Sequence, residues 1–169
     1  MSPSSTARRF AVAATVAVVG VATACTPAPT PVPTYTDGAC PGADGVTVVV
    51  DFTEDLSDEV IVRCALGAQA TGIAALGNIG LAVNSDAAGA VSGSVCTLDG
   101  LPVEGYPYCW STGGFWGYWA AADQSAEWGF STIGAGSGPL TEGSVIGFAW
   151  AQGFEGDAPR VAPDGTPTA

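Results

Sequence analysis

The chain has 169 residues with four basic and sixteen acidic side chains, no histidine and a formal net charge of −12. Such an acidic excess excludes binding to nucleic acid and electrostatic attraction to anionic lipid headgroups, because both need clusters of lysine or arginine. The absence of histidine and lysine excludes Ser-His-Asp catalysis, imidazole metal sites, lysine Schiff bases and P-loop phosphate binding.

Residues 1–24 are predicted to be a secretion signal. Arg8 and Arg9 precede an apolar run over 10–21, and small residues then lead to Cys25. The run is shorter than the roughly 20 residues that a membrane-spanning helix needs. A cysteine directly after the small residues indicates bacterial lipoprotein processing, so we expect Cys25 to be lipidated and to anchor the chain to the outside of the cell membrane. The alternative is ordinary cleavage after Ala24, which leaves Cys25 unmodified.

The rest of the chain divides by composition into three parts. Residues 25–38 are rich in proline and threonine and are predicted to form an extended tether. Residues 39–154 are predicted to form one disulfide-bonded domain. Residues 155–169 are rich in proline, glycine and aspartate, which predicts a disordered tail.

Within the domain, the β-branched run at 46–52 predicts a strand, and 59–64 predicts its hairpin partner. The hydrophobic spacing at 67–80 then predicts a short helix, weakened by Gly72 and Gly77. Further strands are predicted at 81–84, 93–98, 115–121, 128–133 and 145–151. A hairpin, one helix and more strands predict an α+β domain of the β-grasp type. An all-β sandwich is the alternative.

Five cysteines occur in the chain, and lipidation of Cys25 leaves an even four. Thiols pair in an oxidising compartment, so we expect two disulfides. The predicted hairpin brings Cys40 close to Cys64, and Cys96 and Cys109 flank a turn region. The alternative is a four-cysteine zinc site, which the spacing does not favour because it contains no CxxC pair. We therefore predict no metal and no cofactor.

Aromatic residues are concentrated in the last third of the chain, and five of them are the candidate ligand-binding residues. In the strand predicted at 115–121, alternation directs Trp116 and Tyr118 to one face and Trp119 to the other. Both faces of this strand therefore carry large rings, and exposed rings suit stacking on a sugar, a planar macrocycle or an apolar ligand. The alternative is that the rings fill the core. The candidates are Trp116, Tyr118, Trp119, Trp128 and Trp150.

An acidic cluster in the first hairpin suggests two kinds of chemistry. Its carboxylates could bind calcium, but they lack the spacing and the glycine of an EF-hand loop. Two of them could also act as the acid and base of a glycosidase. A solvated hairpin loop is the interpretation that we favour, so we predict no catalytic residues. The cluster consists of Asp51, Glu54, Asp55, Asp58 and Glu59.

Several segments carry a resemblance to known proteins. They are GVTVVVDF at 45–52, VRCA at 62–65, VCTLDGLP at 95–102, YW at 118–119 and GSVIGFAW at 143–150. Together they look like a group of secreted actinobacterial proteins of unassigned function. Their order is also similar to the C-terminal domain of transcobalamin and intrinsic factor. That second resemblance implies a β-grasp module that caps a ligand such as a corrinoid, together with a helical partner protein or a membrane transporter. Without histidine to bind cobalt, only the capping role remains.

Two functions of different classes follow. The first is a tethered binding module that presents or caps a small ligand on its aromatic surface. The second is a surface module that docks a partner protein and binds no small molecule. Neither function is enzymatic.

Overall fold

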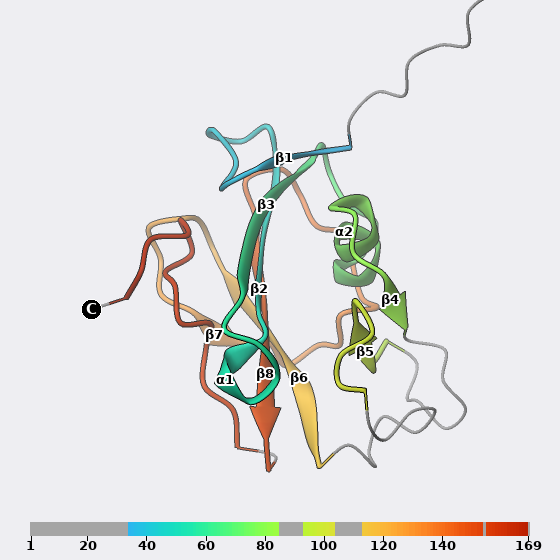
Figure 1. Ribbon diagram of the computed structural model, residues 1–169. Helices are drawn as coiled ribbons and strands as arrows, with labels where there is room; N and C mark the ends of the chain where they lie inside the picture. Colours follow the sequence, from blue (N-terminus) through green and yellow to red (C-terminus); the bar gives the residue numbers. More distant parts are fainter. Residues whose placement is uncertain (1–33, 85–92, 104–112, 154, 169) are drawn as a thin grey trace, which may run out of the picture. The chain divides into compact units, whose positions relative to one another are not determined.

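The computed structural model describes residues 34–84, 93–103, 113–153 and 155–168. Its main feature is a six-stranded sheet in the order β1-β3-β2-β8-β6-β7, accompanied by a separate β4-β5 hairpin (Figure 1). The sheet strands are β1 (Tyr35–Asp37), β2 (Gly45–Asp51), β3 (Val60–Leu66), β6 (Gly114–Ala121), β7 (Gly129–Phe130) and β8 (Val145–Gln152). The other elements are α1 (Thr53–Leu56), α2 (Gly72–Asn78), β4 (Val83–Asn84) and β5 (Thr97–Leu98).

The topology confirms the predicted α+β class and its β-grasp arrangement. Strands β2 and β3 form the antiparallel hairpin, and α2 follows it in the chain. Strand β8 then pairs parallel with β2, with Val49 opposite Gly147. Strand β6 lies antiparallel on the other side of β8, with Gly117 opposite Ala149. The all-β sandwich is wrong: among the described residues, one face of the six-stranded sheet is covered by α2 and the two-stranded β4-β5 hairpin, and not by a second large sheet.

Strand alternation builds the core between the sheet and α2. Val46, Val48 and Val50 of β2 are fully buried in the same cluster as Leu76 of α2 and Phe148 of β8. Each such side chain that is removed from water stabilises the fold by roughly 1.5–3 kcal/mol before entropic costs are counted. Strand β2 is buried along its whole length, which fits its valine-rich sequence, and the polar Thr47 and Asp51 within it are buried as well.

Helix α2 begins later than its hydrophobic pattern predicts. The Thr71 side chain caps it by accepting a hydrogen bond of 3.0 Å from the backbone N–H of Ala74. The next residue, Gly72, lies very close to Tyr118 of β6: a Cβ at this position would be 3.1 Å from the Tyr118 hydroxyl oxygen. The glycine that weakens the helix therefore lets its first turn pack against β6.

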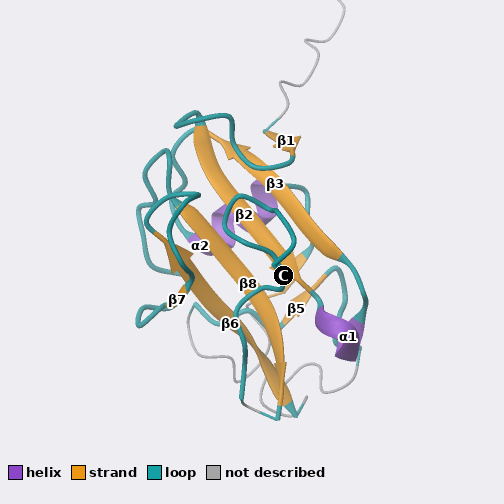
Figure 2. Ribbon diagram, turned by 90° about the vertical axis from the view of Figure 1, so that its left-hand side faces the viewer, coloured by secondary structure: helices purple, strands orange, loops and turns teal. Residues whose placement is uncertain are grey.

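The second face of the sheet is covered by the C-terminal segment, so the predicted disorder of the tail is wrong for 155–168. Figure 2 shows this segment in front of the sheet and α2 behind it. Small residues leave room for it: a Cβ at Gly147 would lie 2.9 Å from the Pro159 ring. The Trp128 indole also donates a hydrogen bond of 2.8 Å to the Val161 carbonyl oxygen.

The predicted tether also ends earlier than expected, because β1 lies within it. Thr36 of β1 pairs with Cys64 of β3 in the antiparallel register. Arg63 holds this strand in place: it forms a salt bridge of 3.2 Å with Asp37, and its guanidinium lies 4.8 Å from the centre of the Tyr35 ring. The signal at 1–24, Cys25 and the proline-rich stretch up to residue 33 lie outside the described residues.

The structure contains the predicted disulfide between Cys40 and Cys64, with a Cα–Cα separation of 4.7 Å. Cys96 is also disulfide-bonded. Its predicted partner, Cys109, lies outside the described residues, so that pairing stays a prediction.

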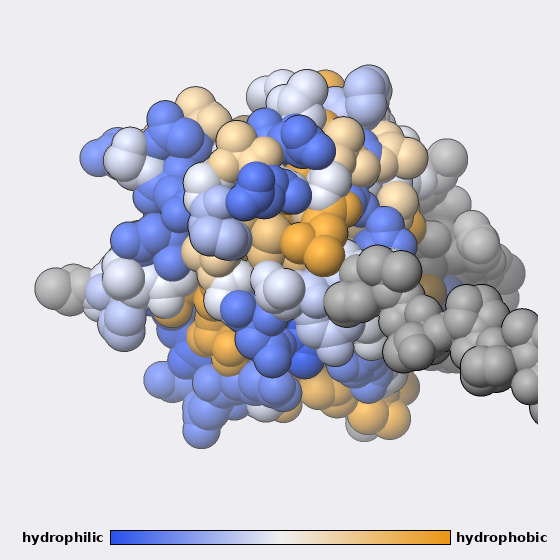
Figure 3. All heavy atoms as spheres, turned by 90° about the horizontal axis from the view of Figure 1, so that it is seen from above, coloured by the Kyte–Doolittle hydropathy of each residue, from blue (hydrophilic) through white to orange (hydrophobic). Residues whose placement is uncertain are grey.

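From above, hydrophilic residues surround smaller apolar patches (Figure 3). Among the described helices, none has the length and apolar character needed to cross a membrane.

Candidate functional site

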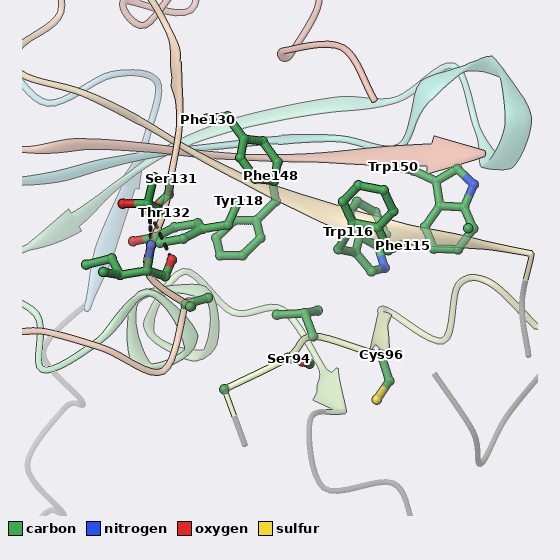
Figure 4. Close-up of a pocket in the computed structure, with 16 residues that line it drawn as sticks. Ser94, Cys96, Phe115, Trp116, Tyr118, Phe130, Ser131, Thr132, Phe148 and Trp150 are labelled. Carbon is green, nitrogen blue, oxygen red and sulfur yellow. Dashed lines mark hydrogen bonds between the residues drawn. The ribbon is translucent and has the colours of Figure 1, made fainter. Parts of the chain in front are cut away.

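A cavity of about 390 Å³ lies beside strands β6 and β8. Trp116 and Tyr118 of β6 contribute to its wall, together with Phe148 and Trp150 of β8. The segments at 93–96 and 130–135 complete the lining (Figure 4). A volume of this size falls near the lower end of the range of small-molecule sites.

The rings of the wall are held rigidly by one another. Trp116 packs edge-on between Phe52 and Trp150, with ring centres 5.2 and 5.7 Å apart. Tyr118 and Phe148 lie 5.0 Å apart in a tilted arrangement. Aromatic pairs in these geometries contribute about 0.5–1.5 kcal/mol each beyond simple burial. The cavity therefore has a preformed aromatic wall.

One polar atom of this wall lacks a partner. The Trp116 side chain is only 6 % exposed, and among the described residues its buried Nε1–H donates to no acceptor. Its neighbour Trp150 differs, because the Trp150 Nε1–H donates a bond of 3.1 Å to Gln152 Oε1. A buried donor without a partner costs about 1–3 kcal/mol, and buried polar groups are rarely left in that state.

The rest of the lining combines hydroxyl groups with apolar residues. Ser94, Ser131 and Thr132 contribute hydroxyl groups, and the Ser131 hydroxyl donates to the Ile133 carbonyl oxygen at 2.9 Å. Phe130 and Ile133 are 56 % and 59 % exposed and also belong to the lining. The described residues that line the cavity include no carboxylate and no basic side chain. Such a surface can stack on rings and form hydrogen bonds.

Burial raises the pKa of the Tyr118 phenol above its ordinary value of 10.0. The folded state thus disfavours the tyrosinate, so Tyr118 contributes its full stability below pH 10 and loses it as the pH rises through the folded pKa. We expect Tyr118→Phe to lose less stability than the wild type between pH 9 and pH 11. Urea unfolding at both pH values measures this difference. Equal losses in the two proteins would contradict it.

The structure brings together three of the five predicted binding residues. Trp116, Tyr118 and Trp150 line the cavity. Trp116 and Tyr118 point to the same face of β6, and Trp150 lies opposite Trp116 in β8. Trp119 does not line the cavity, and its ring packs edge-on against that of Phe130, its cross-strand neighbour in β7, with ring centres 5.2 Å apart. Trp128 does not line the cavity either, because it is bonded to the C-terminal segment. These two residues are therefore not part of this candidate site.

Sequence reasoning missed the segments opposite the aromatic wall. Ser94, Ser131 and Ala135 line the cavity but lie in stretches with no recognisable motif. Phe148 is an aromatic residue of a predicted strand and lies two positions before Trp150, so both side chains point to the same face of the sheet. This spacing is the sequence signal that could have added Phe148 to the site.

The acidic cluster forms no metal site among the described residues. Glu54, Asp55, Asp58 and Glu59 are exposed, as expected for a solvated loop. Asp51 departs from that expectation, because it is fully buried. Its carboxylate accepts hydrogen bonds of 2.7 Å from the backbone N–H of Arg160 and 2.8 Å from the guanidinium of the same residue. Asp51 is therefore a structural anchor for the C-terminal segment.

Comparison with protein-family models, with curated proteins and with solved structures finds no match for this chain. The resemblances drawn from the sequence segments therefore stay predictions.

Proposed function

We propose that this chain is a membrane-tethered, extracytoplasmic binding module that holds a small ligand in the aromatic cavity and presents it to a partner protein or transporter. The observation that carries the proposal is the preformed wall of Trp116, Tyr118 and Trp150 with one unpartnered donor. A surface of this kind binds without needing to reorganise its side chains, which lowers the entropic cost of association. The module is proposed to be a binder without catalytic activity.

The size of the cavity limits the part of a ligand that it can enclose. About 390 Å³ suits a ligand of two or three fused rings better than a corrin macrocycle. A corrinoid, as the sequence resemblance implies, would contact the site by one edge only. It would leave most of its surface for a second protein, which is the capping role.

A partner-docking function is the second candidate. It is favoured by the exposure of Phe130 and Ile133, because large apolar side chains on an acidic surface suit contact with another protein. Both residues also line the cavity, so docking there would cover a bound ligand.

Binding can be tested with prodan, a neutral naphthyl ketone whose emission shifts to the blue in apolar surroundings. We expect the mature full-length chain to bind it with one-to-one stoichiometry. Ile133→Asp is expected to weaken binding at least fivefold, since it places a carboxylate among the lining residues. Val103→Asp is the matched control, because Val103 is 78 % exposed and does not line the cavity.

Equal weakening by both variants would place the probe elsewhere and contradict the proposed site. Prodan is not the natural ligand, so native mass spectrometry of the chain purified from its host provides the second measurement. We expect a bound small molecule that Ile133→Asp reduces. A stoichiometric protein partner without any small molecule would instead favour docking.

A further inference from the structure

We infer that the ligand of the aromatic cavity is an uncharged planar molecule with a hydrogen-bond acceptor, such as an aryl ketone or a quinone, and that the acceptor binds Trp116 Nε1–H. This inference rests on the proposed binding function of the same cavity. It adds the chemical class of the ligand and the atom that selects it.

The first step is that the Trp116 indole cannot turn away to find another partner. Its backbone is paired with Trp150 in the register of β6 and β8, and its ring is held between the rings of Phe52 and Trp150. Figure 4 shows the indole nitrogen directed toward the side of the cavity where Ser94 and Cys96 lie. The direction of this donor is therefore a fixed property of the cavity wall.

The second step compares Trp116 with the other described tryptophans. Trp150 and Trp128 each donate to an acceptor of this chain, at 3.1 and 2.8 Å. Trp119 Nε1 is also buried and has no partner among the described residues, but Trp119 does not line the cavity. Trp116 thus combines three properties: its donor is unpaired, its side chain is nine-tenths buried and its ring lines the cavity. An acceptor on a bound molecule would satisfy it.

The third step is the charge of the ligand. An anion would find no free cation in the part of the chain that the structure describes, because Arg63 is bonded to Asp37 and Arg160 to Asp51, and the net charge of −12 repels it. A cation would be attracted by the rings, but it would face the positive end of the Trp116 N–H, and none of the described lining residues is a carboxylate. Burying an unpaired charge is strongly unfavourable. A neutral ligand with an acceptor fits all these features.

The test uses three naphthalenes of similar size that displace prodan from the mature full-length chain. 2-Acetylnaphthalene carries a neutral acceptor, 2-ethylnaphthalene carries none and 2-naphthoate is an anion. We expect 2-acetylnaphthalene to bind about tenfold more tightly than either of the others, since a buried donor discriminates against a molecule that leaves it unpaired.

Two variants assign this preference to one atom. Trp116→Phe is expected to abolish the tenfold preference for 2-acetylnaphthalene over 2-ethylnaphthalene. Trp128→Phe is the matched control and is expected to retain it, because it removes an indole N–H that already has a partner, and Trp128 does not line the cavity. In 15N-labelled wild type, one indole N–H resonance is expected to move downfield with 2-acetylnaphthalene and to be missing in Trp116→Phe.

The possible outcomes distinguish a failure of the inferred ligand class from a failure of the proposed binding function. Equal wild-type affinities for 2-acetylnaphthalene and 2-ethylnaphthalene would overturn the inference about the acceptor and leave the binding function standing. Tighter binding of 2-naphthoate would overturn the inference of an uncharged ligand. Failure of prodan and of all three naphthalenes to bind would overturn the proposed cavity function itself. If Trp116→Phe does not fold, the wild-type comparison still decides.

Discussion

Replacing Cys40 and Cys64 together by alanine is expected to lower the free energy of unfolding by about 3.5 kcal/mol. The bridge joins positions 24 residues apart, and the chain-entropy treatment of a loop of this length gives a value of that order. Removing the bridge increases the conformational freedom of the unfolded chain. The loss is large for one domain, because total stabilities are about 5–15 kcal/mol.

The native contacts of the bridge add a local effect. Cys64 lies in β3 opposite Thr47 of β2, and the backbone N–H of Cys40 donates to the Thr47 hydroxyl at 3.0 Å. Gln124 donates to the Cys40 carbonyl oxygen at 2.7 Å. The bridge therefore fixes the segment before β2 beside the loop that contains Gln124, and hydrogen exchange in this segment is expected to rise in the variant.

Guanidinium unfolding followed by tryptophan fluorescence measures the global effect. Besides the lower midpoint, the denaturant slope is expected to increase, because an uncrosslinked unfolded chain exposes more surface. A Thr36→Ala variant in β1 is a suitable control, since it lies opposite Cys64 but leaves the bridge intact. A loss below about 1 kcal/mol with an unchanged slope would show that the bridge does not constrain the unfolded state.

The parts of the fold that could be predicted are those where local pattern and tertiary structure agree. The β-branched run of β2 and the alternation of Trp116, Tyr118 and Trp119 predict strands with two distinct faces, and the structure has both. Periodicity alone could not show which face borders a cavity. That depends on segments 93–96 and 130–135, whose positions are set by contacts distant in the sequence.

The C-terminal segment shows where composition misleads. Its proline, glycine and aspartate content is typical of disorder, yet residues 155–168 cover the second face of the sheet. Amino-acid composition cannot show that this face of the sheet contains Gly147 and Ala149, whose small size leaves room for the C-terminal segment to pack on the sheet. It also cannot register that Asp51 and Arg160, 109 positions apart, form an ion pair.

That pair leads to the second large effect. Asp51→Ala is expected to destabilise the fold by about 4 kcal/mol, because the fully buried carboxylate accepts hydrogen bonds from backbone N–H groups and from the Arg160 guanidinium, and bonds to a charged group contribute about 1.5–3 kcal/mol each. The carboxylate also accepts from the backbone N–H groups of Thr53 at 2.9 Å and Arg160 at 2.7 Å, and both donors would lose their acceptor. Asp37→Asn is the control: the Asp37 side chain is 86 % exposed, so its pair with Arg63 contributes about 0–1 kcal/mol.

Arg160→Met is expected to cost less, about 2 kcal/mol, because Arg160 is 38 % exposed and Asp51 keeps its two backbone donors. Adding Arg160→Met to Asp51→Ala is expected to cost almost nothing more, since the guanidinium has already lost its partner. Urea unfolding of the four proteins gives the coupling energy. Additive losses would mean that the two side chains contribute independently of each other.

Trypsin provides a local measurement of the same pair, since Arg63 and Arg160 are the basic residues that remain after removal of the predicted signal. In the wild type, the Arg160 side chain is bound to Asp51 and its backbone N–H donates to the same carboxylate. Arg63 lies within β3. Asp51→Ala is therefore expected to speed cleavage after Arg160 at least tenfold under conditions in which Arg63 stays protected. Equal acceleration at both arginines would indicate global unfolding, whereas selective cleavage after Arg160 identifies Asp51 as the residue that holds the C-terminal segment on the sheet.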